Sequence, residues 1–175
     1  MEYVDLDHAR SFPPLANPAA TTLILGSMPG QASLAAHQYY AHPRNAFWPI
    51  MGQLVGAHPS LDYEARVGAL LDARIALWDV LGACLRRGSL DSNIEREGLV
   101  VNDFHGFLAD HPAISRIFFN GAKAAQLFET LVQPALGDRQ IARQRLPSTS
   151  PAHAGMKFPD KLAAWRQIVE ANVGI

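Results

Sequence analysis

The sequence has 175 residues and a single cysteine, Cys84. One thiol cannot form an intramolecular disulfide framework, an iron–sulfur cluster or a zinc site built on several thiolates, and this scarcity is typical of proteins from reducing cytoplasm. No apolar run approaches the ~20 residues that span a bilayer. The N-terminus carries acidic residues where a signal or transit peptide needs basic ones. We therefore expect a cytoplasmic protein that does not enter a membrane.

The sequence also lacks an excess of charge of either sign, because its net charge is −1. Such a protein has no global field that attracts nucleic acid, which excludes a histone-like or coating protein but leaves a local basic groove open. A hydrophobic share of 49% and a charged share of 18% are typical of a globular protein. No repeat or linker divides the chain. We expect one monomeric domain over residues 1–175, with residues 1–20, which contain Pro13, Pro14 and Pro18, as an irregular arm.

Four short apolar segments predict β-strands: Thr21–Leu25, Ile75–Leu81, Ile114–Phe119 and Gln140–Leu146. The last alternates polar and apolar residues, which predicts an edge strand. Amphipathic helical patterns lie between and after them, at residues 47–55, 63–71, 100–108, 124–131 and 162–169. This alternation favours the α/β class, with a parallel sheet covered on both faces. Ligands of such sheets bind outside the carboxyl ends of the strands.

The segment after the first predicted strand is Gly26–Gly30, in which two glycines let the backbone approach a ligand closely. It matches neither a Walker loop nor G-x-G-x-x-G, so an ordinary turn is an alternative. The next segment, Gln38–Trp48, is rich in large polar and aromatic groups. Pro43 suits a helix start, which puts Asn45 in the first helical turn. Tyr40 and Asn45 are candidates for a site, whereas Phe47 suits a core or a pocket wall equally.

Two polar side chains end later strands. Asp79 follows an apolar run, and a buried carboxylate is costly unless something pairs with it. It either faces a ligand or caps the next turn, near Gly82. Asn120 either contacts a ligand or caps the helix that begins near Ala122. We expect the polar segment Arg86–Asn93 to be a solvated loop.

The segment after the last strand, Leu146–Gly155, holds three consecutive hydroxyl residues between two prolines. Hydroxyl and backbone N–H groups often contact phosphate oxygens. Between Arg139 and Arg166 there are six basic residues and one acid, Asp160. This composition predicts a short nucleic-acid footprint rather than extensive wrapping. The seven histidines lack metal-ligand spacing, so we expect no metal.

Taken together, Gly26–Gly30, Tyr40–Trp48 and Leu146–Ala152 resemble the motifs of the uracil-DNA glycosylase superfamily. The resemblance is closest to its hypoxanthine-DNA glycosylase branch, also called DNA-deoxyinosine glycosylase. The Ala-His-Pro-x-Asn-x-Phe-Trp stretch is also similar to the mismatch-specific uracil/thymine branch. The resemblance extends from about Ser11 to the C-terminal helix.

The resemblance implies a three-layer α/β/α sandwich with a short, mainly four-stranded parallel sheet. It implies a monofunctional DNA glycosylase of base-excision repair, which needs no cofactor. Such an enzyme hydrolyses the N-glycosidic bond of a deaminated base flipped out of double- or single-stranded DNA. The base implied by the closest branch is hypoxanthine.

The resemblance also implies roles for single residues. Asn45 would be the catalytic polar residue, and Tyr40 would stack on the flipped base. The other base-binding residues would be Ser27, Met28, Phe47, Asp79 and Asn120. The last motif would press into the minor groove, with DNA contacts from Ser148, Thr149, Ser150 and His153. Either His153 or Met156 would fill the gap left by the flipped base.

One departure from the superfamily pattern changes the expected chemistry. Many members carry Asp or Asn in the first motif, where this chain has Met28. A thioether cannot activate water, so the catalytic load shifts to Asn45. An amide has no accessible proton equilibrium, and we expect it to orient water through its carbonyl oxygen. Asp79 could accept the N1–H of hypoxanthine, but uracil also presents an N–H beside a carbonyl.

Three alternatives remain open. One is a uracil- or mismatch-specific DNA glycosylase with the same fold. Another is a damaged-DNA binder without catalysis. The third is a serine hydrolase that uses Ser27 or Ser150, although the chain lacks a G-x-S-x-G motif.

Overall fold

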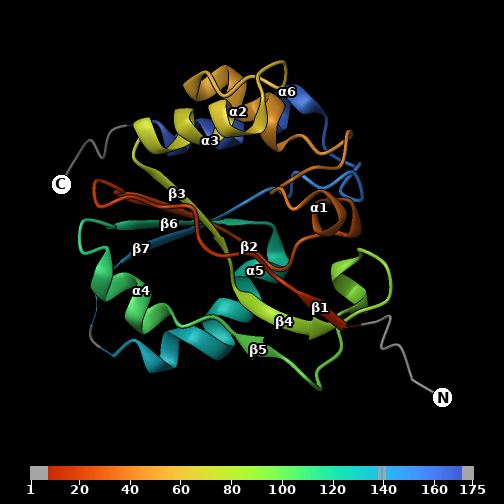
Figure 1. The fold of residues 1–175 in the computed structure, drawn as a ribbon, viewed down its shortest axis with the longest axis vertical. Coiled ribbons are helices and arrows are strands. Elements are labelled where there is room, and N and C mark those ends of the chain that lie inside the picture. Colours follow the sequence, from red (N-terminus) through yellow and green to blue (C-terminus); the bar gives the residue numbers. More distant parts are fainter. Residues whose placement is uncertain (1–7, 138, 140, 171–175) are drawn as a thin grey trace.

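The computed structural model describes residues 8–137, 139 and 141–170. A parallel sheet crosses its centre (Figure 1), with the strand order β3-β2-β6-β7. The strands are β2 (Thr22–Gly26), β3 (Ile75–Asp79), β6 (Arg116–Asn120) and β7 (Ala142–Leu146). All four predicted strands are confirmed to within two residues at each end, apart from Gln140, which lies outside the described residues. The polar strand β7 forms one edge, as expected.

The strand register brings the carboxyl ends of the sheet together. Gly26 pairs with Asp79, and Asn120 pairs with Leu146. The residues that follow these strands therefore start from one edge of the sheet, which is where the sequence motifs were expected to meet.

Helices cover both faces of the sheet (Figure 1). Ile24 of β2 packs in a cluster with α2 (Phe47–Val55), α3 (Tyr63–Asp72) and α6 (Phe158–Trp165). Its neighbours Leu23 and Leu25 pack in the opposite cluster, with α4 (Phe104–Asp110) and α5 (Ala122–Leu127). Alternate residues of a strand point to opposite faces, so β2 supplies both cores. The predicted three-layer α/β/α sandwich is confirmed.

Short elements connect these layers. α1 (Gln31–Ala36) follows the first motif, and a 3₁₀ turn at Asp91–Asn93 lies in the Arg86–Asn93 segment. After α5 the chain continues as a π-helical turn (Phe128–Val132) and a 3₁₀ turn (Gln133–Ala135), and a further 3₁₀ turn (Arg166–Ile168) follows α6. No helix in the described part of the chain is long and apolar enough to cross a bilayer.

A second, antiparallel sheet corrects several sequence-based expectations. It consists of β1 (His8–Arg10), β4 (Leu81–Leu85) and β5 (Val100–Val101), in the order β1-β4-β5. The expected arm therefore contributes a strand, and the strand predicted to reach Leu81 ends at Asp79. The predicted start of the helix at residues 100–108 was wrong, because Val100 and Val101 form a strand that pairs with β4. That helix begins at Phe104, where Asp103 accepts the Gly106 N–H at 3.0 Å.

The start of α2 also differs from the expectation. The helix begins at Phe47, so Asn45 lies before its N-cap rather than in its first turn. A tight turn precedes it, in which the Asn45 N–H donates to the His42 carbonyl at 2.9 Å. This turn leaves the Asn45 side chain beside the helix N-terminus.

Candidate functional site

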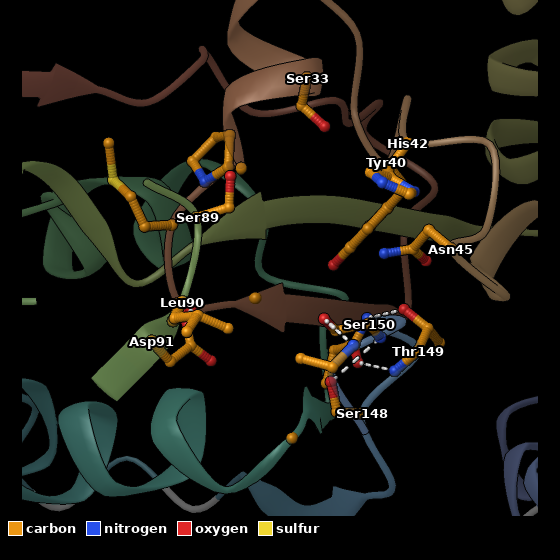
Figure 2. A pocket seen from close by; sticks show the side chains of 18 of the residues that line it. Ser33, Tyr40, His42, Asn45, Ser89, Leu90, Asp91, Ser148, Thr149 and Ser150 are labelled. Atoms are coloured by element: carbon orange, nitrogen blue, oxygen red, sulfur yellow. Dashed lines mark hydrogen bonds between the residues drawn. The ribbon is translucent and has the colours of Figure 1, made fainter. Parts of the chain in front are cut away.

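A cavity of about 430 Å³ opens at the carboxyl edge of the parallel sheet. Its walls come from residues 26–33, 39, 40, 42, 45, 79, 89–92, 120–123 and 148–153 (Figure 2). The sequence-predicted residues that line it are Ser27, Met28, Tyr40, Asn45, Asp79, Asn120, Ser148, Thr149, Ser150 and His153. Met156 does not line it and is 36% exposed. Three motifs that are far apart in the chain thus form one site.

Tyr40 and Asp79 meet beside the backbone of Gly26. A Cβ atom on Gly26 would lie 2.6 Å from Asp79 Oδ1 and 3.0 Å from the Tyr40 hydroxyl. The Tyr40 hydroxyl and Asp79 Oδ2 are both buried, and neither has a hydrogen-bond partner. Buried polar atoms are nearly always paired in folded proteins. An unpaired donor and an unpaired acceptor beside one cavity therefore point to a ligand that pairs with both.

The ionisation of these two groups follows from their burial. Desolvation, with a further contribution from Asp91, raises the pKa of Asp79 to about 7, and the Arg86 guanidinium opposes this shift. Burial, followed by the charge of Asp79, raises the pKa of Tyr40, and the nearby Asn120 amide opposes this shift without making a hydrogen bond of acceptable geometry, so the Tyr40 hydroxyl keeps its proton at neutral pH. Of the two alternatives for Asp79, the cap of the turn at Gly82 is not seen, since Asp79 Oδ2 has no hydrogen-bond partner.

Phe47 is the predicted base-binding residue that the structure moves away from the cavity. It is fully buried in the core and does not line the cavity wall. Its ring stacks on Tyr40 with a centroid distance of 4.1 Å and an interplanar angle of 27°. Phe47 therefore covers one face of the Tyr40 ring and supports it from behind.

Asn45 presents its amide nitrogen to the cavity. Its Oδ1 accepts the Phe47 N–H at 2.9 Å, and Figure 2 shows the nitrogen on the cavity side. The carbonyl oxygen, which the sequence argument assigned to water, already has a backbone partner. The group that Asn45 offers to a ligand or water is thus an N–H donor.

Asn120 fastens the last motif instead of capping a helix. Its Nδ2 donates to Thr149 Oγ1, and its Oδ1 accepts the Thr149 N–H, both at 2.9 Å. α5 starts without a side-chain cap, so the capping interpretation was wrong. Thr149 is only 1% exposed, which leaves Ser148, Ser150 and His153 as the loop residues that can face DNA. The Thr149 carbonyl accepts the Ala46 N–H at 2.9 Å and joins this loop to the start of α2.

The loop at Arg86–Asn93 was expected to be merely solvated, and the structure makes it a cavity wall. Ser27 Oγ donates to Asp91 Oδ1 at 2.6 Å, which links this loop to the first motif. Arg86 is 4% exposed and donates through Nη2 to the Pro29 carbonyl. Asp91 had no signal in the sequence beyond its place in a polar loop, because only the folded chain brings it to Ser27.

Two lysines also differ from the sequence-based interpretation. Lys161, counted in the basic patch, is 5% exposed, and its Nζ donates to the His153 carbonyl at 2.7 Å. Burial lowers the pKa of this ammonium. Lys123, on α5, which the sequence alone would make either phosphate-facing or solvated, lines the cavity. Lys161 therefore holds the last motif in place, and Lys123 adds a positive charge beside its hydroxyl groups.

Among the described residues, no three His, Cys, Asp or Glu side chains lie close enough together to bind a metal ion. The cavity instead combines uncharged amides, two carboxylates, two buried phenols and a hydroxyl-rich loop.

Comparison with known proteins gives consistent relatives. Residues 13–170 match the family model of the uracil DNA glycosylase superfamily. A hypoxanthine DNA glycosylase from Methanosarcina acetivorans is 37% identical over 145 residues, which cover 82% of this chain and 87% of the relative. A hypoxanthine DNA glycosylase from Methanosarcina barkeri is 38% identical over 118 residues, covering 67% and 73%.

A solved structure agrees with these sequence relatives. It is a solution NMR structure from Methanosarcina acetivorans, of a protein provisionally named a uracil DNA glycosylase. The two chains share 34% identity with a TM-score of 0.75, over 93% of this chain and 99% of the other. The matched residues include every segment that forms the cavity. The chain belongs to the uracil DNA glycosylase superfamily.

Proposed function

We propose that this protein is a monofunctional DNA glycosylase of base-excision repair that releases hypoxanthine from deoxyinosine in DNA. The observation that carries the preference for a deaminated base over adenine is the pair of unpartnered buried groups, Asp79 Oδ2 and the Tyr40 hydroxyl. The names of the two Methanosarcina relatives support the same substrate.

The cavity has room for one base but not for a duplex. Its volume of about 430 Å³ lies within the usual range of small-molecule sites. A base inside a duplex is unreachable, so the target must rotate out of the stack at a cost of a few kcal/mol. Mismatched and damaged pairs need the least energy for this step, which favours deaminated bases at the first stage of recognition.

Hypoxanthine fits the pair of groups at the cavity floor. It presents a donor, N1–H, beside an acceptor, O6. The ionised form of Asp79 accepts the N1–H, and the Tyr40 hydroxyl donates to O6. Adenine presents the reverse pattern, a bare N1 and an amino group, so that ionised Asp79 faces an acceptor and receives no hydrogen bond. A site built to pair with polar groups rejects an analogue that lacks them by large factors.

Tyr40 acts in this arrangement through its hydroxyl rather than as a stacking platform. One face of its ring is already occupied by Phe47 at 4.1 Å, and its hydroxyl reaches the Gly26 backbone at the cavity floor. The family resemblance suggested stacking on the base. The contacts of Tyr40 favour recognition of the base edge.

Asn45 holds the attacking water. Its Nδ2 is the free group on the cavity side, while its oxygen is fixed by the Phe47 N–H at 2.9 Å. The water is positioned but not deprotonated by this amide, so the mechanism depends on orientation and electrostatics. Ser148, Ser150 and His153 contact the DNA backbone beside the flipped nucleotide, and Lys123 contributes charge to the same surface.

Uracil is the second candidate base, because its N3–H and O4 repeat the donor–acceptor pattern of hypoxanthine. Single-turnover release of free base from matched duplexes that contain deoxyinosine, deoxyuridine or deoxyadenosine decides between them. We expect release of hypoxanthine at the highest rate and no release of adenine. Faster release of uracil would make this a uracil-specific enzyme, and tight binding without release would make it a damage binder.

Tyr40→Phe tests the pairing directly, since it removes only the hydroxyl. We expect a loss of about tenfold to hundredfold in hypoxanthine release, the effect of about 1–3 kcal/mol for an unpaired buried group. Tyr63→Phe is the matched control, because the Tyr63 hydroxyl accepts the Tyr39 N–H and lies outside the cavity lining. Equal rates in Tyr40→Phe and wild type would overturn the assignment.

A further inference from the structure

One demand of the reaction is not met by the residues assigned so far. This inference rests on the proposed function. As the bond between the sugar and the base breaks, the electron pair leaves with the base and positive charge develops on the sugar. A fixed negative charge beside that sugar lowers the barrier most effectively. Asn45 carries no charge, and the first motif has the apolar Met28.

The cavity offers two carboxylic acids among its described lining residues, Asp79 and Asp91. Asp79 lies at the floor, where it is 3% exposed and touches the space above Gly26. This position suits the edge of the base. Its pKa of about 7 also means that it is not a permanent anion at neutral pH.

Asp91 differs from Asp79 in its position and in having a hydrogen-bond partner. It is half-buried on the Arg86–Asn93 loop and accepts a hydrogen bond from Ser27 Oγ at 2.6 Å. This short bond from a hydroxyl to a carboxylate oxygen fixes where the Asp91 side chain lies. The Asp91 charge contributes to the raised pKa of Asp79, so its field reaches the cavity floor.

Asp91 and Asn45 lie apart from each other in the cavity. Figure 2 shows Asp91 and Asn45 on opposite sides of the cavity, with the Tyr40 hydroxyl between them in the view. The hydrogen bond from Ser27 holds Asp91 against the first motif. Ser27 is the residue that precedes Met28 in the chain. The carboxylate thus reaches the first motif from a different loop.

We propose that Asp91 is the carboxylate that stabilises the positively charged sugar, and that Ser27 is the residue that positions it. The C1′–N9 bond breaks with its electron pair on the base, and the oxygen of water forms the new bond to C1′. The proton that the water loses ends on the base, which leaves as a neutral molecule. Asp91 forms and breaks no covalent bond and acts through its charge.

The test compares two DNA analogues that lack a base. A duplex with a pyrrolidine abasic site is cationic at the sugar position, and a duplex with a tetrahydrofuran abasic site is neutral and of similar shape. The measured quantity is the ratio of their dissociation constants. Wild-type protein should bind the cationic duplex at least tenfold more tightly than the neutral one.

Asp91→Asn is the informative variant, because its amide oxygen still accepts the Ser27 hydroxyl while the charge is lost. It should lower the preference for the cationic duplex at least tenfold and slow single-turnover release of hypoxanthine by at least a hundredfold. Ser27→Ala should shift both in the same direction by a smaller factor. Asp110→Asn is the control for charge alone, since Asp110 is exposed on α4, outside the cavity lining; both readouts should stay unchanged.

A structural role for Asp91 gives a different pattern. If Asp91→Asn slows release but keeps the wild-type preference for the cationic duplex, Asp91 only builds the loop and the proposal is wrong. Wild-type preference and wild-type rate together would also overturn it. If Asp91→Asn does not fold, as judged by thermal melting, the shift in Ser27→Ala decides. Failure of the proposed glycosylase function gives a different result, because wild-type protein would then release no base. The proposed role of Asp91 would be overturned with it.

Discussion

Asn120 and Thr149 hold each other by two hydrogen bonds of 2.9 Å, although 29 residues separate them in the chain. Both side chains are buried, at 8% and 1% exposure. This pair fixes the hydroxyl-rich loop to the end of β6. The Thr149 carbonyl extends the connection to Ala46, next to Asn45, so the segment that carries Asn45 and the hydroxyl-rich loop are held as one unit.

Removal of the Asn120 side chain should therefore loosen the loop. Asn120→Ala leaves the Thr149 N–H and hydroxyl unpaired in the interior, which we expect to cost about 1–3 kcal/mol of the free energy of unfolding. Thr149→Val removes only one of the two bonds and should cost less. Urea unfolding measures both. A larger loss in Thr149→Val than in Asn120→Ala would contradict this reading of the pair.

Gly26→Ala should block the base site without unfolding the protein. The new Cβ would lie 2.6 Å from Asp79 Oδ1 and 3.0 Å from the Tyr40 hydroxyl, so both groups must move. We expect hypoxanthine release to fall by at least a hundredfold, because small displacements of groups at a site have large effects. Gly68→Ala is the control, since a Cβ there meets no atom within 4 Å. Equal single-turnover rates in Gly26→Ala and wild type would show that the base does not reach this floor.

Asp79 should make stability depend on pH. Its pKa rises from 3.8 to about 7 on folding, mainly through desolvation. The native state therefore holds this proton more tightly, and the free energy of unfolding should fall as pH rises from about 4 to about 7 and then level off. Asp79→Asn removes this dependence and should be the more stable protein above about pH 7, by up to roughly 4 kcal/mol. Urea unfolding of both proteins at about pH 5 and pH 8 measures the difference; a constant difference would rule the shift out.

The same ionisation should appear in catalysis. If ionised Asp79 accepts the N1–H of hypoxanthine, kcat/KM for hypoxanthine release should rise with pH through about 7, the pKa of the free enzyme's carboxyl. Asp79→Asn should lose this rise and also narrow the gap between hypoxanthine and adenine, because its amide can donate to adenine N1. A rate that falls with pH through this region would assign the protonated acid instead.

Two substitutions of Asn45 separate its two amide atoms. Asn45→Ala removes the acceptor of the Phe47 N–H and should cost about 0.5–2 kcal/mol of stability as a lost helix-end contact. Asn45→Asp keeps that acceptor but lacks the NH₂ group. We expect both variants to lose most turnover while Asn45→Asp keeps the wild-type melting temperature. High activity in Asn45→Asp would return the catalytic role to the oxygen.

Borohydride should not trap the protein on substrate DNA. Lys123 lines the cavity, and we expect its ammonium group to contact a DNA phosphate and not to attack the sugar. Lys123→Met should weaken DNA binding and reduce its salt dependence by about one phosphate contact. It should not abolish base release, and efficient trapping of wild type that Lys123→Met abolishes would show covalent catalysis.

The sequence by itself determined the parallel sheet and the positions of the motifs along it. Continuous apolar runs such as Leu23–Leu25 are buried on both faces and indicate central strands wherever they occur. Strand ends then predict where polar residues gather, which identified Asp79, and the polar and aromatic segment before a helix start identified Tyr40 and Asn45; all three line the cavity. These patterns depend only on residues that are close together in the sequence, so they can be recognised before the chain folds.

Only the tertiary structure decided which of these residues face a ligand and which support the site. Phe47 and Asn120 have the residue types of a base pocket, but packing against Trp165 and pairing with Thr149 occupy them. Asp91 shows the reverse, since a residue in an unremarkable polar loop becomes part of the cavity through its bond to Ser27. Such contacts join residues 29 to 64 positions apart, and a side chain's role there depends on whether a distant partner satisfies it or leaves it free.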